Sequence, residues 1–392
     1  MPRKRSQKLI DPKDLGRWRL IADFQQRLTS LCERMGVGST FKDPKRQLQI
    51  EQYLGLFLFG LLNPVVRSMR GLCEASLLER VQEDICGRQV SLGSFSEAQS
   101  VIAPELLEAV FSELVSEVHP GSKAEAQLLK EWSIVDSTLW EALPRMHWAL
   151  WRRQGTLQNA VRLHLSLHVL DDKPIKATVT PGRVCERTAW RDLWMRGDAY
   201  IGDRNFGRSF KMFSELDELG CTFILRLCDT APIIDEELPL GEADIEANVI
   251  RQAWVYLGSE DYRSMRLRLV WVQTPKEVLL LVTNQTPEQL SAELVAELYR
   301  RRWQVELFFR WVKCILGNRH WLAESQRGVA IQIYLALIGA LLLQTRLGVR
   351  PNKRMFEAIQ LYLMGVATLD ELEKSVERQL ARMAAAKAKK RG

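Results

Sequence analysis

Between residues 131 and 227, short apolar runs alternate with amphipathic stretches, and this pattern limits the possible folds of the chain most strongly. Val161–Leu170 (VRLHLSLHVL) alternates apolar and polar residues, and Pro174–Thr180 (PIKATVT) follows after a turn, which predicts a hairpin. A hairpin followed by alternating helices and strands is typical of a mixed sheet covered by helices, in the α/β class. The predicted strands are Glu131–Asp136, Val161–Leu170, Pro174–Thr180, Ala199–Ile201 and Cys221–Leu227, and the predicted helices are Glu186–Arg196 and Arg208–Leu219.

Helical patterns dominate both ends of the chain. Met1–Ala126 is predicted to be helical and poor in strands, and its most regular helix, Leu48–Leu61, ends at an Asn-Pro pair. Near the other end, the apolar stretch Val329–Leu343 and the segment Ala358–Leu380 are predicted helices. Val329–Leu343 is shorter than the roughly 20 residues that cross a bilayer, so it is interpreted as a buried core helix and no membrane partner is expected.

A further helix, predicted over Pro287–Gly317, carries four functional groups on one edge. They are Tyr299, Arg302, Glu306 and Lys313, at offsets of three, seven and fourteen residues from the first, which at roughly 100° per residue keeps them within a stripe about 60° wide. A carboxylate beside two cations and a phenol could bind a phosphodiester substrate. The acid can hold a metal ion, and the other groups can hold phosphate oxygens. The alternative is an exposed helix with many salt bridges, since i,i+3 and i,i+4 pairs are common.

Two aspartates upstream are candidates to join Glu306. Asp136 ends the predicted strand Glu131–Asp136 (EWSIVD) and is followed by Ser and Thr. Asp203 follows an apolar strand and a Gly in the segment AYIGDRNF, with Arg204 beside it. Taken alone, Asp136 also fits an aspartate that caps a turn. The alternatives to Asp203 are Asp171, Asp172 and Asp198.

These three segments resemble the motifs of one enzyme family. Y-x2-R-x3-E-x6-K resembles the signature around the catalytic Glu of bacterial insertion-sequence transposases of the DDE type, in the subgroup called insertion-sequence family four. V-D-S-T at Asp136 and D-R-x-F at Asp203 are similar to the two upstream motifs of that family. The resemblance implies a ribonuclease-H-like fold with a β-rich insertion before the last catalytic helix. It also implies roles: Asp136, Asp203 and Glu306 as catalytic residues and metal ligands, and Tyr299, Arg302, Lys313 and Arg204 as contacts to DNA and its phosphates.

The chemistry of such a trio of acids requires a cofactor. Three converging carboxylates repel one another and stay ionised together only if divalent cations neutralise them. Mg²⁺ or Mn²⁺ favours oxygen ligands, and two such ions roughly 3.5–4 Å apart activate the attacking oxygen and stabilise the leaving one. The expected reaction is hydrolysis of a DNA phosphodiester, followed by attack of the freed 3′ hydroxyl on another. The partners that the resemblance implies are double-stranded DNA, at the transposon ends and in the target, and a second copy of the chain in a synaptic complex.

The resemblance also implies a division of the chain into four parts. The strand patterns Ile250–Gly258, Ser264–Gln273 and Glu277–Asn284 fit the β-rich insertion. We expect a helical N-terminal region at 1–126 that binds transposon ends, a catalytic core at 127–227 and 286–345, the insertion at 228–285, and a helical C-terminal region with a basic tail at 346–392.

Composition agrees with a polyanionic partner. The formal net charge is +7 and the sequence pI is about 9.0, with basic clusters at Pro2–Lys8 and Lys387–Arg391. The seven cysteines form no C-x-x-C pair, and no signal peptide is recognisable. We therefore expect a protein of the reducing bacterial cytoplasm, associated with the nucleoid.

Two other functions remain open at this point. A ribonuclease-H-like nuclease would cut DNA without joining it, and a domesticated transposase would bind DNA without catalysis. His164 and His168 lie on a predicted strand without a zinc pattern, so structural roles are expected for both. Trp254 and Trp271, in the insertion, fit either core packing or stacking on an unpaired base.

Overall fold

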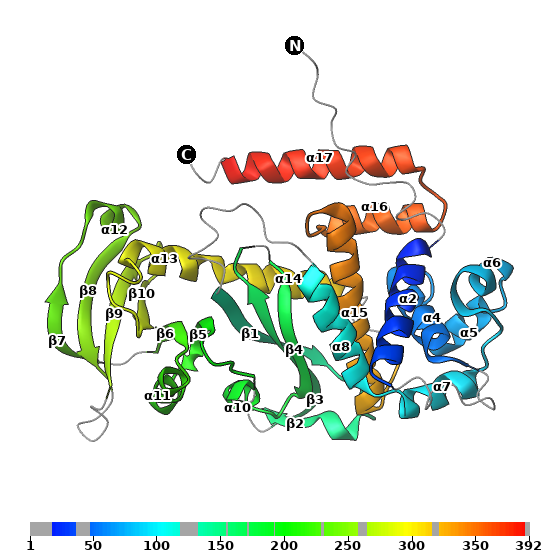
Figure 1. Cartoon of the computed structure of the whole chain (residues 1–392), viewed down its shortest axis with the longest axis horizontal. Helices are drawn as coiled ribbons and strands as arrows, with labels where there is room; N and C mark the ends of the chain where they lie inside the picture. The colour runs from blue at the N-terminus through cyan, green and yellow to red at the C-terminus, as the bar shows by residue number, and fades with distance from the viewer. Residues whose placement is uncertain are drawn as a thin grey trace, which may run out of the picture. The chain divides into compact units, whose positions relative to one another are not determined.

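The computed structural model describes residues 18–36, 48–117, 132–153, 156–170, 172–191, 193–228, 231–257, 265–315 and 321–388. Contacts divide the chain into two units (Figure 1). Unit 1 comprises Met1–Val118, Glu141–Trp148 and Arg310–Gly392, and unit 2 comprises His119–Trp140 and Ala149–Phe309. The predicted basic arm Pro2–Lys8 and residues 389–391 of the second arm lie outside the described residues.

Unit 2 is built on one ten-stranded sheet (Figure 1). The strand order is β2-β3-β1-β5-β6-β10-β9-β8-β7, and β4 pairs with β3. The strands are β1 (Trp132–Glu141), β2 (Leu150–Arg153), β3 (Thr156–His168), β4 (Pro174–Pro181), β5 (Ala199–Gly207), β6 (Thr222–Leu227), β7 (Ile233–Leu238), β8 (Val249–Tyr256), β9 (Arg266–Gln273) and β10 (Val278–Thr283). Every predicted strand is present, although β1 and β5 continue well beyond their predicted ends.

One half of the sheet has the strand order of a ribonuclease-H-like core. β3 and β4 form the predicted antiparallel hairpin, in which Leu163 pairs with Val179. β1 lies between β3 and β5. β5 is parallel to β1 and also to β6, so Ile201 pairs with Ile134 on one side and Ile224 on the other. The prediction of a mixed α/β fold with this core is confirmed.

The β-rich insertion continues the same sheet. β10 pairs antiparallel with β6, and β9, β8 and β7 follow as antiparallel neighbours. The three predicted strands are confirmed, whereas β7 and helix α12 (Glu242–Glu246) were not predicted. The sequence of β7 (IIDEEL) contains three consecutive acids and therefore lacks the apolar pattern of a strand. In the structure these acids form ion pairs with Arg251 of β8 and Arg266 of β9.

The same two arginines cover the two tryptophans of the insertion. The Arg251 guanidinium lies 4.7 Å from the ring centre of Trp271, and that of Arg266 lies 4.8 Å from the ring centre of Trp254. Both indoles are half-buried. Trp271 also packs against the hydrophobic core, whereas the ring contact described for Trp254 is the cation–π contact with Arg266.

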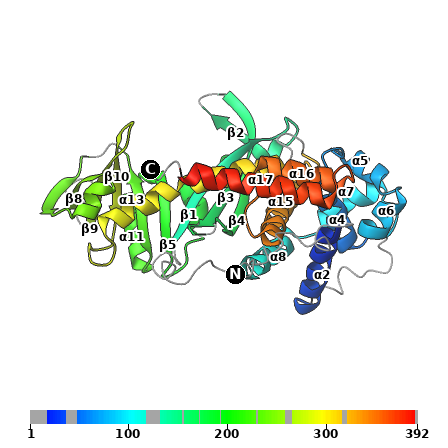
Figure 2. The same ribbon diagram turned by 90° about the horizontal axis from the view of Figure 1, so that it is seen from above.

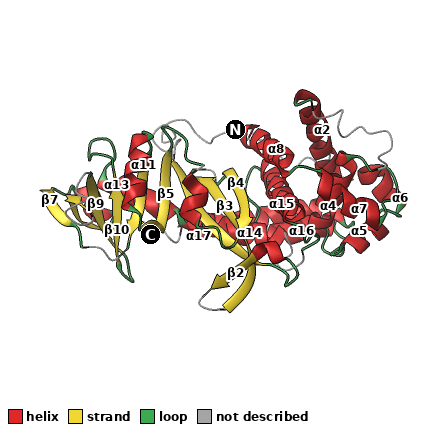
Figure 3. Cartoon of the chain, turned by 90° about the horizontal axis from the view of Figure 1, so that it is seen from below, coloured by secondary structure: helices red, strands yellow, loops and turns green. Residues whose placement is uncertain are grey.

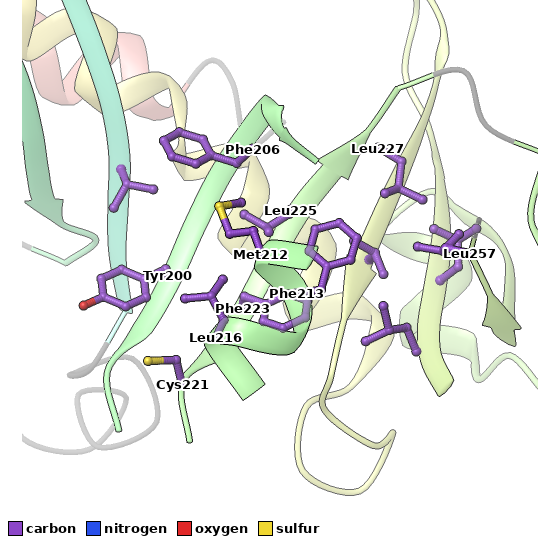
Figure 4. Packing of buried hydrophobic residues seen from close by; sticks show 14 of the residues in the cluster. Tyr200, Phe206, Met212, Phe213, Leu216, Cys221, Phe223, Leu225, Leu227 and Leu257 are labelled. Carbon is purple, nitrogen blue, oxygen red and sulfur yellow. The ribbon is translucent and has the colours of Figure 1, made fainter. Parts of the chain in front are cut away.

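An aromatic core holds β5 and β6 together, and so fixes the strand that carries Asp203. Figure 4 shows Phe213 of α11 (Phe210–Glu218) against Phe223 of β6, and their rings stack with centroids 5.5 Å apart. Tyr200 and Phe206 of β5 are buried in the same cluster. Each buried aromatic side chain contributes about 1.5–3 kcal/mol relative to an exposed one.

Unit 1 is helical where it is described (Figures 2 and 3). Its helices are α2 (Arg19–Arg34), α4 (Ile50–Leu62), α5 (Met69–Ala75), α6 (Glu79–Val81), α7 (Leu92–Val101), α8 (Pro104–Glu117), α15 (Gln326–Leu347), α16 (Lys353–Leu363) and α17 (Leu369–Ala388). α15 packs against α4, α7 and α8. By length and composition α15 could cross a membrane, but 94% of its most apolar window is buried within the protein. It is the core helix that the sequence predicts.

The helical stretch predicted over Ala358–Leu380 consists of two helices, α16 and α17, with a turn between them. α16 ends at Leu363, and Gly365 adopts a φ of 76°, which is a left-handed conformation that glycine accepts without strain. The backbone N–H of Val366 donates to the Leu361 carbonyl and closes the turn before α17 begins at Leu369. Gly365 and the capping box that Thr368 forms with Glu371 are sequence signals of this turn that the prediction did not use.

His164 has the structural setting that the sequence predicts. Its ring is completely buried between β3 and β4, and Nε2 lies 2.9 Å from Thr180 Oγ1. Burial, and secondarily the positive charge of Arg162, lowers the pKa of His164 from 6.5 to about 4. The ring is therefore neutral in the folded protein at neutral pH.

This buried ring makes stability depend on pH. As the pH falls below 6.5, His164 becomes protonated in the unfolded chain but stays neutral in the folded protein, so the free energy of unfolding decreases. The decrease ends at about pH 4, where His164 is protonated in both states. The change corresponds to about 3 kcal/mol. We expect His164→Gln to remove most of this acid sensitivity in urea unfolding at pH 4.5 and 7. His147→Gln, which alters an exposed ring, is the control, and an unchanged pH dependence in His164→Gln would contradict the assignment.

Candidate active site

The sequence predicts Asp136 at the end of a strand. In the structure it lies in the middle of β1. The strand continues through Ser137 and Thr138 to Glu141, because β-branched and aromatic residues follow and Trp140 is buried. Asp136 Oδ1 accepts a hydrogen bond of 2.7 Å from the Ser137 backbone N–H. Its side chain is only 15% exposed.

Asp203 lies beside Asp136 because of the register between two parallel strands. Val135 of β1 pairs with Gly202 of β5, so the next residue on each strand is one of the two aspartates. Asp203 was predicted at a strand exit, and β5 instead continues to Gly207, but its pairing with β6 is interrupted between Gly202 and Gly207. In this irregular segment Asp203 Oδ1 accepts a hydrogen bond of 2.8 Å from the Asn205 backbone N–H.

The helix predicted over Pro287–Gly317 is divided in two at Arg302. α13 spans Ala292–Arg301 and α14 spans Trp303–Ile315. At the junction Arg302 N–H donates to the carbonyl three residues before it, and its own carbonyl accepts from the residue three after it. These shorter i,i+3 bonds tighten the chain locally, which periodicity in the sequence does not reveal.

Arg302 joins the first and third predicted acids. Its Nη1 donates to Asp136 Oδ2 at 3.2 Å, and its Nη2 donates to Glu306 Oε1 at 2.7 Å. The three side chains are 19%, 15% and 33% exposed, respectively, so this bridge is mostly shielded from water. Residues 166 positions apart in sequence therefore meet on one guanidinium.

The other predicted DNA contacts occupy different settings. Tyr299 is buried, which raises the pKa of its phenol, and its ring centre lies 6.0 Å from the Arg302 guanidinium. Lys313 lies on the part of α14 that belongs to unit 1, and partial burial lowers the pKa of its amine. The Arg204 side chain is exposed, and among the described contacts none joins it to the three acids.

Glu186 is a fourth acid near this cluster, and it was not predicted. It is the first residue of α10 (Glu186–Arg191) and is 6% exposed. Its Oε2 accepts a hydrogen bond of 2.6 Å from Asn205 Nδ2. Burial raises the pKa of Glu186, while the side chains of Asn205 and Ser137 oppose the shift. A Glu at the start of a helix normally stabilises the helix dipole, so its position gave no signal of another role.

The electrostatics of Asp136 test whether a cation fits this group. Burial raises the pKa of Asp136 to about 8, and the negative charges of Glu186 and Asp203 add to the shift. Arg302 and the Ser137 N–H act in the opposite direction. A buried acid next to two others, with one guanidinium as counter-ion, favours a further cation, and oxygen ligands fit Mg²⁺ or Mn²⁺.

The acids do not yet form a complete metal cage. Among the residues that the structure describes, no three His, Cys, Asp or Glu side chains lie close enough to hold one ion. The Arg302 guanidinium lies between Asp136 and Glu306, so these two carboxylates converge on a common cation only if Arg302 releases at least one of them.

Comparison with known proteins assigns the family. The family described as "Transposase DDE domain" matches residues 128–343, which is more than half of the chain. The chain belongs to this family. DDE transposases act on DNA and generally use divalent metal ions. The match includes Asp136, Asp203 and Glu306 and covers the expected catalytic core except residues 127, 344 and 345.

Individual proteins and one solved structure are also similar to the chain. The chain is 25% identical over 227 residues to "Putative transposase y4zB" of Sinorhizobium fredii, a match that spans 56% of this chain and 61% of that protein. It is 22% identical over 331 residues to "Probable transposase for insertion sequence element IS5377" of Geobacillus stearothermophilus, which spans 83% and 82%. A cryo-EM structure titled "piggyBac transposase synaptic complex with hairpin DNA" has a TM-score of 0.46 at 10% identity, over 96% of this chain and 84% of that one.

Removal of the guanidinium bridge should destabilise the protein without metal. In Arg302→Gln the largely buried Asp136 loses its counter-ion, so we expect the free energy of unfolding to fall by about 1–3 kcal/mol. Mn²⁺ should restore more of the stability than in the wild type, because it neutralises the same carboxylates. Thermal unfolding with and without Mn²⁺ measures both effects.

Arg301→Gln is the matched control for this measurement. Arg301 pairs with Glu297 at 3.2 Å on the surface of α13, and loss of a surface pair costs at most about 1 kcal/mol. Equal losses in the two variants, or an equal response to Mn²⁺, would show that Arg302 does not serve as the counter-ion of the acids.

Proposed function

We propose that this DDE transposase cleaves DNA at transposon ends and transfers the freed strand to target DNA, with Asp136, Asp203 and Glu306 as its catalytic acids. The observation that supports this assignment most strongly is the Arg302 bridge, which joins Asp136 to Glu306 from distant parts of the sequence. The register of β1 and β5, which brings Asp203 beside Asp136, supplies the remaining member.

The three acids would hold two Mg²⁺ or Mn²⁺ ions. When bound, such ions activate an oxygen nucleophile and stabilise the leaving oxygen of the phosphodiester. The acids would supply the ligands, and the low exposure of Asp136 limits the water that would weaken these electrostatic interactions. Ionisation of Asp136 is the main cost, because its pKa of about 8 lies above neutral pH.

The cationic side chains near the acids would position DNA. Once a divalent ion neutralises the carboxylates, Arg302 is free to donate its N–H groups to a phosphate in a bidentate manner. Lys313 would contact a neighbouring phosphate, Tyr299 would hydrogen-bond to DNA from its buried position, and Arg204 would assist from the exposed side of β5. The partners are double-stranded DNA at transposon ends and in the target, in the bacterial cytoplasm at the nucleoid, with two copies of the chain in the synaptic complex.

The predicted four-part division of the chain belongs to the same proposal. Residues 1–126 would bind transposon ends, 127–227 and 286–345 would form the catalytic core, 228–285 would shape the site, and 346–392 would contribute partner contacts. The two contact units follow a different boundary because α15, at the end of the proposed core, packs with α4 and α8 in unit 1.

The catalytic assignment is tested by Glu306→Gln, which removes one negative metal ligand while keeping the shape of the side chain. We expect cleavage of supercoiled DNA in Mg²⁺ to fall by at least about 10³-fold, as for loss of a major electrostatic element of catalysis. Glu297→Gln, an exposed acid on α13, is the control. Cleavage that survives Glu306→Gln would refute the site, and cleavage by the wild type without joined products would identify a nuclease.

DNA binding should depend steeply on salt. Each phosphate contact contributes about −0.9 to the slope of log K against log salt concentration, because it releases counter-ions from DNA. We expect Lys313→Gln to reduce the magnitude of this slope by about 0.9, the contribution of one phosphate contact. Fluorescence anisotropy with a transposon-end duplex measures the slope. Lys211→Gln, which changes a highly exposed amine on α11, should leave it unchanged. A slope near zero in the wild type would exclude a DNA partner.

A further inference from the structure

Glu186 and Asn205 form a buried connection to one of the catalytic acids. Asn205 uses two different N–H groups: its side-chain amide donates to Glu186 Oε2 at 2.6 Å, and its backbone N–H donates to Asp203 Oδ1 at 2.8 Å. Glu186 is 6% exposed, so its carboxylate has little access to water as an alternative partner. A buried carboxylate that accepts a short hydrogen bond restricts the orientation of the group that donates it.

The backbone around Asp203 depends on this connection. Between Gly202 and Gly207 the regular pairing of β5 with β6 is interrupted, so ladder hydrogen bonds do not fix the residues between them. Pairing resumes where Gly207 lies opposite Leu227, and there a side chain at 207 would collide with the Arg226 carbonyl. A segment fixed at both ends but without ladder bonds in its middle takes its conformation from side-chain contacts.

We propose that Glu186 is a positioning residue for the metal site: through Asn205 it fixes the orientation of the Asp203 carboxylate. This inference rests on the proposed function of Asp203 as a metal ligand. Glu186 itself touches neither substrate nor reacting atoms in this scheme. Partners that orient a metal ligand through hydrogen bonds typically change metal affinity or activity by about 10–100-fold when they are altered.

The connection predicts a specific pattern in a double-mutant cycle. Asn205→Ala removes the amide but keeps the backbone N–H, and we expect Mn²⁺ affinity about 10-fold weaker than in the wild type. Glu186→Gln keeps a carbonyl acceptor for the amide but loses its charge, so a smaller loss of about threefold is expected. Because Glu186 orients Asp203 through Asn205, Glu186→Gln should cost less Mn²⁺ affinity in the Asn205→Ala background than in the wild type. The direct effect of the Glu186 charge on Asp136 is the same in both backgrounds, so it cancels in the cycle.

The readout is Mn²⁺ binding to the full-length chain without DNA, measured by electron paramagnetic resonance of the free ion. DNA cleavage provides a second readout: in both single variants the rate lost at low Mn²⁺ should return at saturating Mn²⁺. Because metal binding also stabilises a weakened fold, urea unfolding of the same variants without metal is measured alongside, and a role in folding alone would show there as a loss of stability. Glu215→Gln is the matched control. Glu215 of α11 also interacts with α10, the helix that carries Glu186, but its Oε1 pairs with Arg191 Nη2 at 3.1 Å on the surface.

The outcomes separate this inference from the proposed function. Asp203→Asn is the reference: if it binds Mn²⁺ and cleaves DNA as the wild type does, the assignment of Asp203 fails. If Asp203→Asn loses both while Glu186→Gln and Asn205→Ala keep wild-type affinity, only the positioning role fails. Additive losses in the double variant would also overturn it, because Glu186 would then act on the site independently of Asn205.

Discussion

The site depends on the free energy of placing several carboxylates in a poorly hydrated space. Asp136 faces the negative charges of Glu186 and Asp203, and burial already disfavours its ionised form. Arg302 relieves part of this cost by bonding Asp136 and Glu306 at once. One guanidinium does not neutralise the whole cluster, so the same features that make the metal-free site unfavourable make a divalent cation favourable there.

The fold serves this arrangement by holding each acid on a different rigid element. Asp136 and Asp203 lie on adjacent parallel strands, and the aromatic core around Phe213 and Phe223 holds β5 and β6 in place. Glu306 lies on α14, immediately after the helix break at Arg302. Since the break places Arg302 at a junction between helices, its side chain can reach an acid of β1 and an acid of its own helix.

Several polar groups near the site hold the proposed metal ligands in place by hydrogen bonds. Asn205 connects Asp203 to Glu186, and the Arg162 guanidinium donates to Ser137, whose backbone N–H holds Asp136. Both aspartates therefore accept a backbone hydrogen bond on one oxygen. Such contacts restrict the directions in which the other oxygen can coordinate an ion.

The sequence by itself determined most of the strands and helices, because alternating apolar patterns are local properties, and short motifs that resemble those of the family led to the proposal of the three acids. It did not determine where β1 and β5 end, because the polar residues at Asp136 and Asp203 resemble strand exits, nor the break at Arg302, because the helical period continues through it. The role of Glu186 was also hidden, because an acid at the start of a helix has an ordinary explanation. Only the tertiary structure decided which charges face one another, since the contacts of Arg302 with Asp136 and of Asn205 with Glu186 join residues far apart in sequence.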